Sequence, residues 1–160
     1  MPFTLSHAVL APPLAKLSKG YLPTAALAIG CMTPDLIRLF TQQDGGKTHL
    51  WNALIYPNLV IGLFFCLLWY FIYRPVLYRF FGLQDPLRLT QFKTSMGFVI
   101  GIVIGILVGV STHLVWDGLT HVDFRTFAFR DFLSQSISLF GQRFPVHRVL
   151  QIGTSIVALP

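Results

Sequence analysis

The chain has 160 residues, enough for one domain or one small membrane bundle. Hydrophobic residues make up 54% of it and charged residues only 11%, against about 25% in a typical soluble domain. So little charge cannot cover a globule of this size, which argues against a soluble enzyme, an RNA-binding module and a disordered tail. The 12 Lys and Arg residues outnumber the 6 acidic ones, but they lie mostly between apolar runs, as cations that flank membrane spans do.

The first two apolar segments, residues 5–17 and 22–40, are interrupted and too short to be simple spans. Pro12 and Pro13 break the first, and the second contains Pro34, Asp35 and Arg38. We expect these segments to form a helical hairpin that turns at residues 19–21 and is partly embedded in the membrane. A secretory signal is not expected, because no basic region precedes the first apolar stretch.

Two later segments are long enough to cross a bilayer. Residues 48–73 contain no formal charge, and residues 94–116 are apolar between Lys93 and Asp117. A helix needs about 20 apolar residues to cross the hydrocarbon core, so both segments are predicted to span it. Pro57 and Asn58 should kink the entry to the first span.

Glycines recur every four residues in the second span and therefore form one stripe on a helix. A stripe of small residues lets another helix approach closely. Two partners remain open: a helix of the same bundle, which is the more ordinary reading, or a second protein in a homo-oligomer or membrane complex. The four residues are Gly97, Gly101, Gly105 and Gly109.

The chain changes character after His121. Residues 122–148 mix Phe, Arg and polar side chains, which is typical of an interfacial segment with aromatic anchors. Residues 149–160 are apolar again and resemble a third span cut short, so we expect the natural C-terminus to lie further on. The predicted fold is all-α: a single multi-pass membrane-embedded helical domain over residues 1–160, with an N-terminal hairpin, two strong spans, the interfacial segment and a truncated last span.

Polar side chains near membrane depth are costly, so they mark candidate functional residues. His113 and Asp117 are four residues apart and share one face of a helix. His49 precedes the first strong span, and consecutive spans run antiparallel, so His49 reaches the same membrane face. His7 and Asp35 return to that face through the hairpin. Imidazole and carboxylate groups together can bind a divalent metal, with zinc first and manganese or iron as alternatives.

Each of these residues also has an ordinary reading. His113 and Asp117 could simply hydrogen-bond each other, His7 could assist a helix cap, and Asp35 could pair with Arg38. His49 could be an interfacial residue beside Trp51. We favour the metal site because four separate segments supply its residues. Further residues on that side could surround the metal or touch a substrate: His121, Arg38, Arg125 and Arg130.

Several motifs resemble the bacterial membrane proteins grouped as domain-of-unknown-function family 4184. They are Met1-Pro-Phe-Thr-Leu-Ser-His7, Gly30-Cys-Met-Thr-Pro-Asp35, Thr48-His49, Thr112-His-Leu-Val-Trp-Asp-Gly-Leu-Thr-His121 and Val146-His-Arg-Val-Leu-Gln-Ile-Gly-Thr-Ser155. The chain is also distantly similar to membrane-bound, LexA-regulated proteins described as metal-dependent hydrolases. That similarity implies His7, Asp35, His49, His113 and Asp117 as metal ligands. Leu36 stands where those proteins carry a second Asp, and their additional His-Arg-Gly is absent. The ligand order alone is also similar to that of zinc-dependent phospholipase C.

These observations lead to one main functional hypothesis and one alternative. The main hypothesis is metal-dependent hydrolysis of a phosphoester in a membrane lipid or lipid-linked substrate, with Asp35 as general base. The alternative is a non-catalytic membrane subunit or scaffold whose His and Asp residues form a structural metal site or a polar network. Nucleic acid is not an expected partner. The distribution of Lys and Arg, six on one side and five on the other, places the site on the extracytoplasmic side of a bacterial inner membrane.

Overall fold

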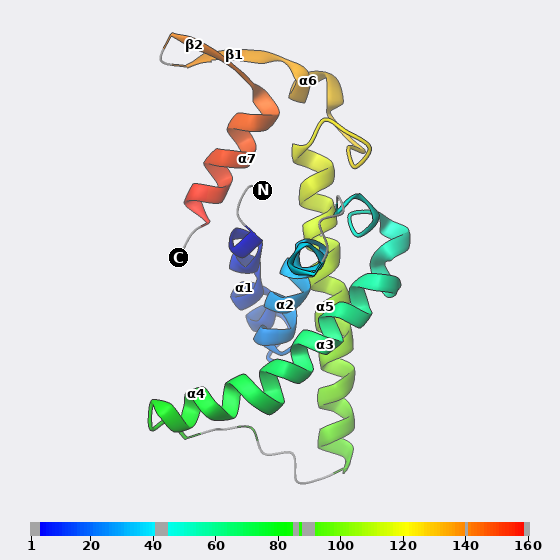
Figure 1. The fold of residues 1–160 in the computed structure, drawn as a ribbon, viewed down its shortest axis with the longest axis vertical. Coiled ribbons are helices and arrows are strands. Elements are labelled where there is room, and N and C mark those ends of the chain that lie inside the picture. The colour runs from blue at the N-terminus through cyan, green and yellow to red at the C-terminus, as the bar shows by residue number, and fades with distance from the viewer. Residues whose placement is uncertain (1–3, 41–44, 85–86, 88–91, 140, 159–160) are drawn as a thin grey trace.

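The computed structural model describes residues 4–40, 45–84, 87, 92–139 and 141–158, and it is mostly helical (Figure 1). An N-terminal 3₁₀ segment (Thr4–Leu10) leads into α1 (Ala11–Leu17), and a turn leads to α2 (Thr24–Leu36). Lys19 and Gly20 have φ values of 52° and 82°, so they reverse the chain between the two helices. The predicted hairpin and its turn are therefore present.

A long helical stretch follows from Trp51 to Phe80. It contains α3 (Val60–Leu68), a wider turn at Trp69–Tyr73, and α4 (Arg74–Phe80). The helix is broken near its start at Tyr56, where φ is −127° and ψ is 121°. Helical φ and ψ angles are disfavoured for the residue that precedes a proline. The break therefore falls at Tyr56, one residue before the predicted kink at Pro57.

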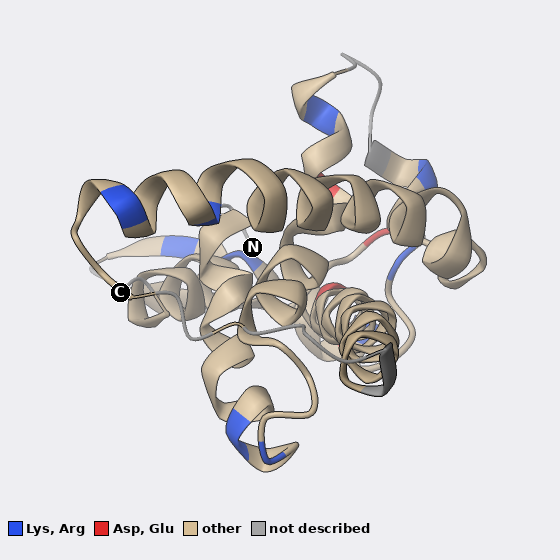
Figure 2. Cartoon of the chain, turned by 90° about the horizontal axis from the view of Figure 1, so that it is seen from below, with Lys and Arg blue, Asp and Glu red and all other residues tan. Residues whose placement is uncertain are grey.

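The longest described helix, α5 (Phe92–Thr120), rises from the bottom of the view in Figure 1 and ends below the top of the molecule. Two segments are long and apolar enough to cross a membrane, Trp51–Phe80 and Thr94–Thr120. Most residues are neither basic nor acidic and are drawn in tan in Figure 2. These are the two segments that the apolar runs predict, although the first extends further toward the C-terminus than residue 73.

The predicted all-α fold is wrong in one detail. After α6 (Arg130–Ser134), β1 (Ser136–Leu139) and β2 (Gln142–Pro145) pair as an antiparallel hairpin, with Ile137 opposite Phe144. Ile137 and Phe144 suit a strand, and Gly141 adopts a positive φ of 79° in the turn. The last element is α7 (Val146–Val157), which begins before residue 149 and is shorter than a span.

The glycine stripe explains how α2 and α5 pack together. A Cβ on Gly101 or Gly109 would lie 2.5 Å from a backbone oxygen of Tyr21 or Leu27, respectively, and a Cβ on Gly105 would lie 3.2 Å from Ala26. These three glycines thus face the hairpin inside the same chain. Within the chain, α2 and the turn before it lie against these three glycines, and the predicted contact with a second protein through the stripe stays a prediction. A Cβ on Gly97 would meet nothing within 4 Å.

Candidate metal centre

Five side chains from four segments come together at the C-terminal part of α5. His113 and Asp117 come from α5 itself, and the helix continues past Gly118, so both point to one side. His7 comes from the N-terminal 3₁₀ segment and Asp35 from the last turn of α2. His49 lies in the turn just before the Trp51–Ala53 segment. The structure therefore brings together all five residues that the sequence analysis proposes as ligands.

The donor atoms form two overlapping groups that share His113. His7, Asp35 and His113 make one group, and His49, His113 and Asp117 make the other. Within each group, one ligand atom from every residue lies within 4.8 Å of the others. The five residues thus supply three imidazoles and two carboxylates to one small volume, which is a donor set suited to a divalent cation.

The distances between donors are those expected around a small ion rather than those of strong hydrogen bonds. His49 Nε2 lies 3.3 Å from Asp35 Oδ1 and 3.5 Å from Asp117 Oδ2, and His113 Nε2 lies 3.5 Å from the same Asp117 oxygen. A charge-assisted N–H···O bond is about 2.7–2.9 Å long. Two ligands each about 2.0–2.1 Å from a tetrahedral zinc ion are about 3.3–3.4 Å apart. The observed separations match the second arrangement.

Neighbouring groups fix the orientation of these ligands. His113 Nδ1 lies 2.7 Å from the backbone oxygen of Cys31, which holds Nδ1 as the donor and leaves Nε2 facing the cluster. Thr4 donates a hydrogen bond of 3.0 Å to Asp35 Oδ2. Thr48 donates to the Pro34 carbonyl at 2.8 Å, and this bond ties the His49 turn to α2. Histidines that bind a metal usually donate the N–H of the other ring nitrogen to a carbonyl or a carboxylate, as His113 does here.

His7 gives the most direct indication that the cluster suits a cation. Its ring stacks on His113 with 3.8 Å between the centroids, and its buried Nε2 has no hydrogen-bond partner among the described residues. Burial, together with the neighbouring His113, lowers the pKa of His7 to about 3, so the ring is neutral at pH 7. A neutral imidazole whose buried ring nitrogen has no partner among the described residues can serve as a metal ligand.

Asp35 remains an anion despite its surroundings. Burial raises the pKa of a carboxyl group, but the hydrogen bond from His49 and the nearby His113 outweigh it and hold the pKa of Asp35 below its usual range. Its side chain is 10% exposed, against 2% for Asp117. Asp35 is therefore the carboxylate of the cluster that is nearest to solvent.

The family description "domain of unknown function (DUF4184)" matches residues 1–160. The chain belongs to the DUF4184 family. No curated protein and no solved structure matches it. The predicted resemblance to this family is confirmed, while the more distant similarity to membrane-bound hydrolases remains a hypothesis. The function of this DUF4184 chain must therefore be argued from its own geometry.

The residues that were predicted to surround the metal or to touch a substrate lie in different environments. Arg125 Nη1 lies 3.1 Å from Asp117 Oδ2, and His121 Nδ1 lies 3.5 Å from Asp117 Oδ1. Arg38 is 3.8 Å from Asp35 and its side chain is 58% exposed. Arg130 is exposed at the start of α6, and no hydrogen bond or ion pair joins it to the cluster within the described ranges. The structure thus brings Arg125 and His121 against Asp117 and leaves Arg130 aside.

The sequence analysis misses one residue that organises the site of this DUF4184 chain. Asp123 is not among the predicted site residues, but it forms a fork-like pair with Arg125 through Nε and Nη2. Asp123 also accepts a hydrogen bond of 2.9 Å from the Arg125 backbone. This local turn directs the guanidinium at Asp117. The close spacing of Asp123 and Arg125 was the available signal, but only the fold shows where the pair points.

Proposed function

We propose that this DUF4184 chain binds one or two divalent metal ions through His7, Asp35, His49, His113 and Asp117, and hydrolyses a phosphoester with their help. The single observation that supports this is the meeting of three imidazoles and two carboxylates around His113, where the buried His7 Nε2 has no hydrogen-bond partner among the described residues. Zinc is the first choice of metal, because its ligands are nitrogen and oxygen donors at the separations found here. Manganese and iron accept the same donors.

The substrate class follows from the proposed place of the chain in a membrane. Only 17% of the apolar window in Trp51–Phe80 and 39% of that in Thr94–Thr120 is buried. The core helix of a soluble protein would be mostly buried, so lipid is the environment that these exposed apolar faces suit. A hydrolase at the end of a membrane span meets lipids and lipid-linked molecules, which commonly carry phosphoesters.

Each residue of the cluster has a role in the proposed reaction. A bound divalent ion would polarise the phosphoryl group and lower the pKa of water toward neutrality. If His49, His113 and Asp117 hold a single ion, Asp35, the more exposed carboxylate, does not bind the ion and accepts a proton from the attacking water. Arg125 and Arg38 lie beside the two carboxylates and pair with phosphate oxygens. Cys31 and Thr48 keep the histidines oriented and take no part in the chemistry.

A structural metal site is the second candidate, and one observation favours it. Asp117 and His113 are almost completely buried, and Arg125 covers one Asp117 oxygen. Structural zinc sites are closed by protein ligands, whereas catalytic sites keep one position open. In this reading the ion ties the N-terminal 3₁₀ segment, α2, α5 and the His49 turn together, and the chain serves as a membrane subunit or scaffold.

Measurement of both metal content and hydrolysis distinguishes a catalytic metal centre from a structural metal site. We expect the purified chain to contain close to stoichiometric zinc or manganese and to hydrolyse a generic phosphodiester until a chelator removes the metal. His113→Ala should lose both metal and turnover. His147→Ala is the matched control, since His147 bonds to the Leu133 carbonyl outside the cluster. Metal retention without turnover on a panel of lipids would favour the structural site, and a metal-free purified chain would contradict both.

The proposed location is a bacterial inner membrane with the cluster on the extracytoplasmic side. The weak excess of cations on the opposite side supports this orientation. A reporter enzyme inserted between α4 and α5, at the far end from the cluster, should therefore be active in the cytoplasm. A reporter at this position that is active only outside the cytoplasm would show that the chain has the opposite orientation.

A further inference from the structure

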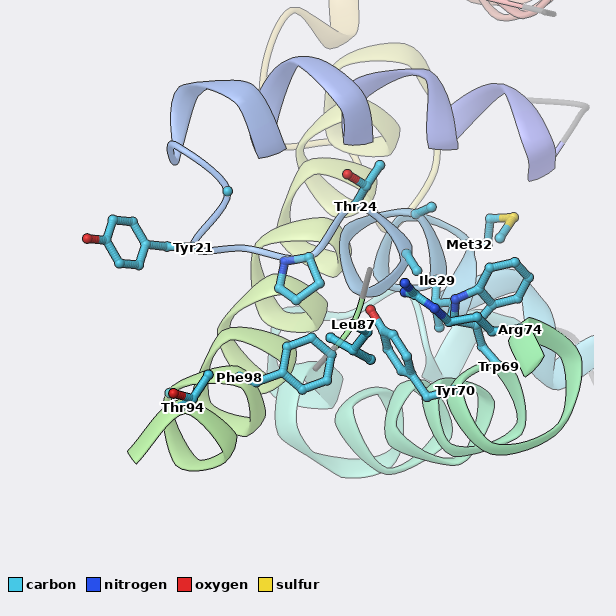
Figure 3. A pocket seen from close by; sticks show the side chains of 15 residues that line it. Tyr21, Thr24, Ile29, Met32, Trp69, Tyr70, Arg74, Leu87, Thr94 and Phe98 are labelled. Atoms are coloured by element: carbon cyan, nitrogen blue, oxygen red, sulfur yellow. The ribbon is translucent and has the colours of Figure 1, made fainter. Parts of the chain in front are cut away.

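A cavity of about 920 Å³ lies at the other end of α5 from the His and Asp cluster. Its walls come from α2 and the turn before it, from Trp69–Arg74, and from the start of α5 at Thr94–Phe98 (Figure 3). Phe98 and His113 are fifteen residues apart on one helix, or about 22 Å at a rise of about 1.5 Å per residue. This cavity is therefore separate from the proposed metal centre and does not depend on it.

The chemistry of the walls is apolar with one positive group. Ile29, Met32 and Phe98 line the cavity, and Arg74 is the one formally charged residue among the described residues that do so. Figure 3 shows Tyr70 and Arg74 directed from the first apolar helix toward α2. The Arg74 guanidinium lies 5.7 Å from the ring centre of Tyr70. No acidic side chain occurs in the described lining, so the cavity is complementary to an anion with an apolar body.

Trp69 adds a second donor at the same place. Its indole N–H is buried and has no hydrogen-bond partner among the described residues, although a buried indole N–H usually finds one. Trp69 precedes Arg74 by five residues, and both line the cavity. A guanidinium and an indole N–H can both donate to phosphate oxygens, and the apolar walls beside them suit an acyl chain.

We propose that this cavity binds one anionic phospholipid, with its phosphate at Arg74 and Trp69 and an acyl chain against Ile29, Met32 and Phe98. The size suits such a ligand, because pockets for drug-sized ligands measure about 300–1,000 Å³. The position suits it as well, because Arg, Trp and Tyr at the end of an apolar helix are typical of the level of lipid headgroups. The proposal goes beyond the proposed function and requires no metal at the cluster.

Fluorescence quenching of Trp69 by brominated lipids tests this proposal directly. A chain with Trp51→Phe and Trp116→Phe retains Trp69 as its only tryptophan. In detergent, brominated phosphatidylglycerol should quench Trp69 with about tenfold higher apparent affinity than brominated phosphatidylcholine, because both lipids carry the phosphate but only phosphatidylcholine carries a choline cation, which Arg74 repels. Arg74→Gln should remove this preference. Arg79→Gln, the same change on the exposed side of α4, should leave it intact.

A second variant fills the cavity without disturbing the fold. A Cβ at Gly97 meets no described atom within 4 Å, so Gly97→Leu adds an apolar side chain beside the cavity without a clash among the described residues. It should weaken quenching by both lipids. Gly153→Leu in α7 is the matched control, since a Cβ there also meets nothing within 4 Å. Unchanged elution from a size-exclusion column verifies that each variant is folded.

Four outcomes would overturn the proposal. Equal quenching by the two lipids would mean ordinary contact with bulk lipid. Quenching that Gly97→Leu leaves unchanged would place the acyl chain elsewhere. Relief of quenching by millimolar inorganic phosphate would indicate a site for small anions only. Trp69 fluorescence that changes with protein concentration but not with lipid would indicate a second copy of the chain. The same experiment in a His113→Ala chain keeps its result independent of the metal proposal.

Discussion

Replacement of Asp117 by Asn is expected to remove the bound metal and any hydrolysis that depends on it. Asp117 is the centre of the cluster, because its carboxylate lies within 3.5 Å of His49, His113, His121 and Arg125. An amide of the same shape supplies no negative charge to a divalent ion. Loss of an outer hydrogen-bond partner costs about 10- to 100-fold in metal affinity, and loss of a direct ligand should cost more. Metal analysis and titration calorimetry of the purified variant measure the change.

Asp123→Asn is the matched control for this prediction. It makes the same chemical change six residues along the chain, but Asp123 contacts Arg125 and its side chain is 35% exposed. We expect this variant to retain its metal and to lose activity only as far as Arg125 loses its position. If Asp117→Asn and Asp123→Asn bind metal equally well, Asp117 is not a ligand and the proposed centre is wrong.

Replacement of Gly109 by Ala should have the largest effect on stability. The added Cβ would lie 2.5 Å from the Leu27 oxygen and 2.7 Å from the Cys31 nitrogen, and both are backbone atoms that cannot move aside like a flexible side chain. Overpacking of this kind costs about 1–3 kcal/mol, and we expect the upper end of that range. Thermal unfolding in detergent would show the loss. Displacement of the Cys31 backbone by the added Cβ would also move the Cys31 carbonyl that orients His113, so metal affinity should fall as well.

For Gly97→Ala, in the same glycine stripe, we expect no loss of stability. A Cβ there meets nothing within 4 Å, and Ala favours a helix over Gly by about 1 kcal/mol. The midpoint of unfolding should stay the same or rise. A loss of stability at Gly97 as large as that at Gly109 would show that the glycines act through the helix backbone rather than through the contact with α2.

Much of the architecture could be read from the order of apolar and polar residues. The two long helices follow from the uncharged runs. In an apolar environment such a run can pair its backbone N–H and C=O groups only by forming a helix. The hairpin follows from its prolines and from Gly20 in the turn. The grouping of the five candidate ligands also follows, because antiparallel spans return residues such as His49 and His113 to one end. None of this required knowledge of how two particular helices touch.

Other features depended on contacts between residues that are distant in the chain. The sequence showed a stripe of glycines, but only the packing of Leu27 and Cys31 against Gly109 decided that the stripe faces α2. The pairing of β1 with β2 was missed, because short strands with exposed side chains carry little periodic signal. The cavity beside Arg74 is likewise built from four separate segments.

The amino-acid order by itself therefore determined which segments are apolar helices and which polar residues are too costly to lie there without a purpose. Those properties are local, since they follow from hydropathy and from the period of a helix. The tertiary structure alone decided which faces meet, that Arg125 is directed at Asp117, and that the buried His7 Nε2 has no hydrogen-bond partner in the described part of the chain. Such properties depend on side-chain packing across the whole chain, and no local pattern encodes them.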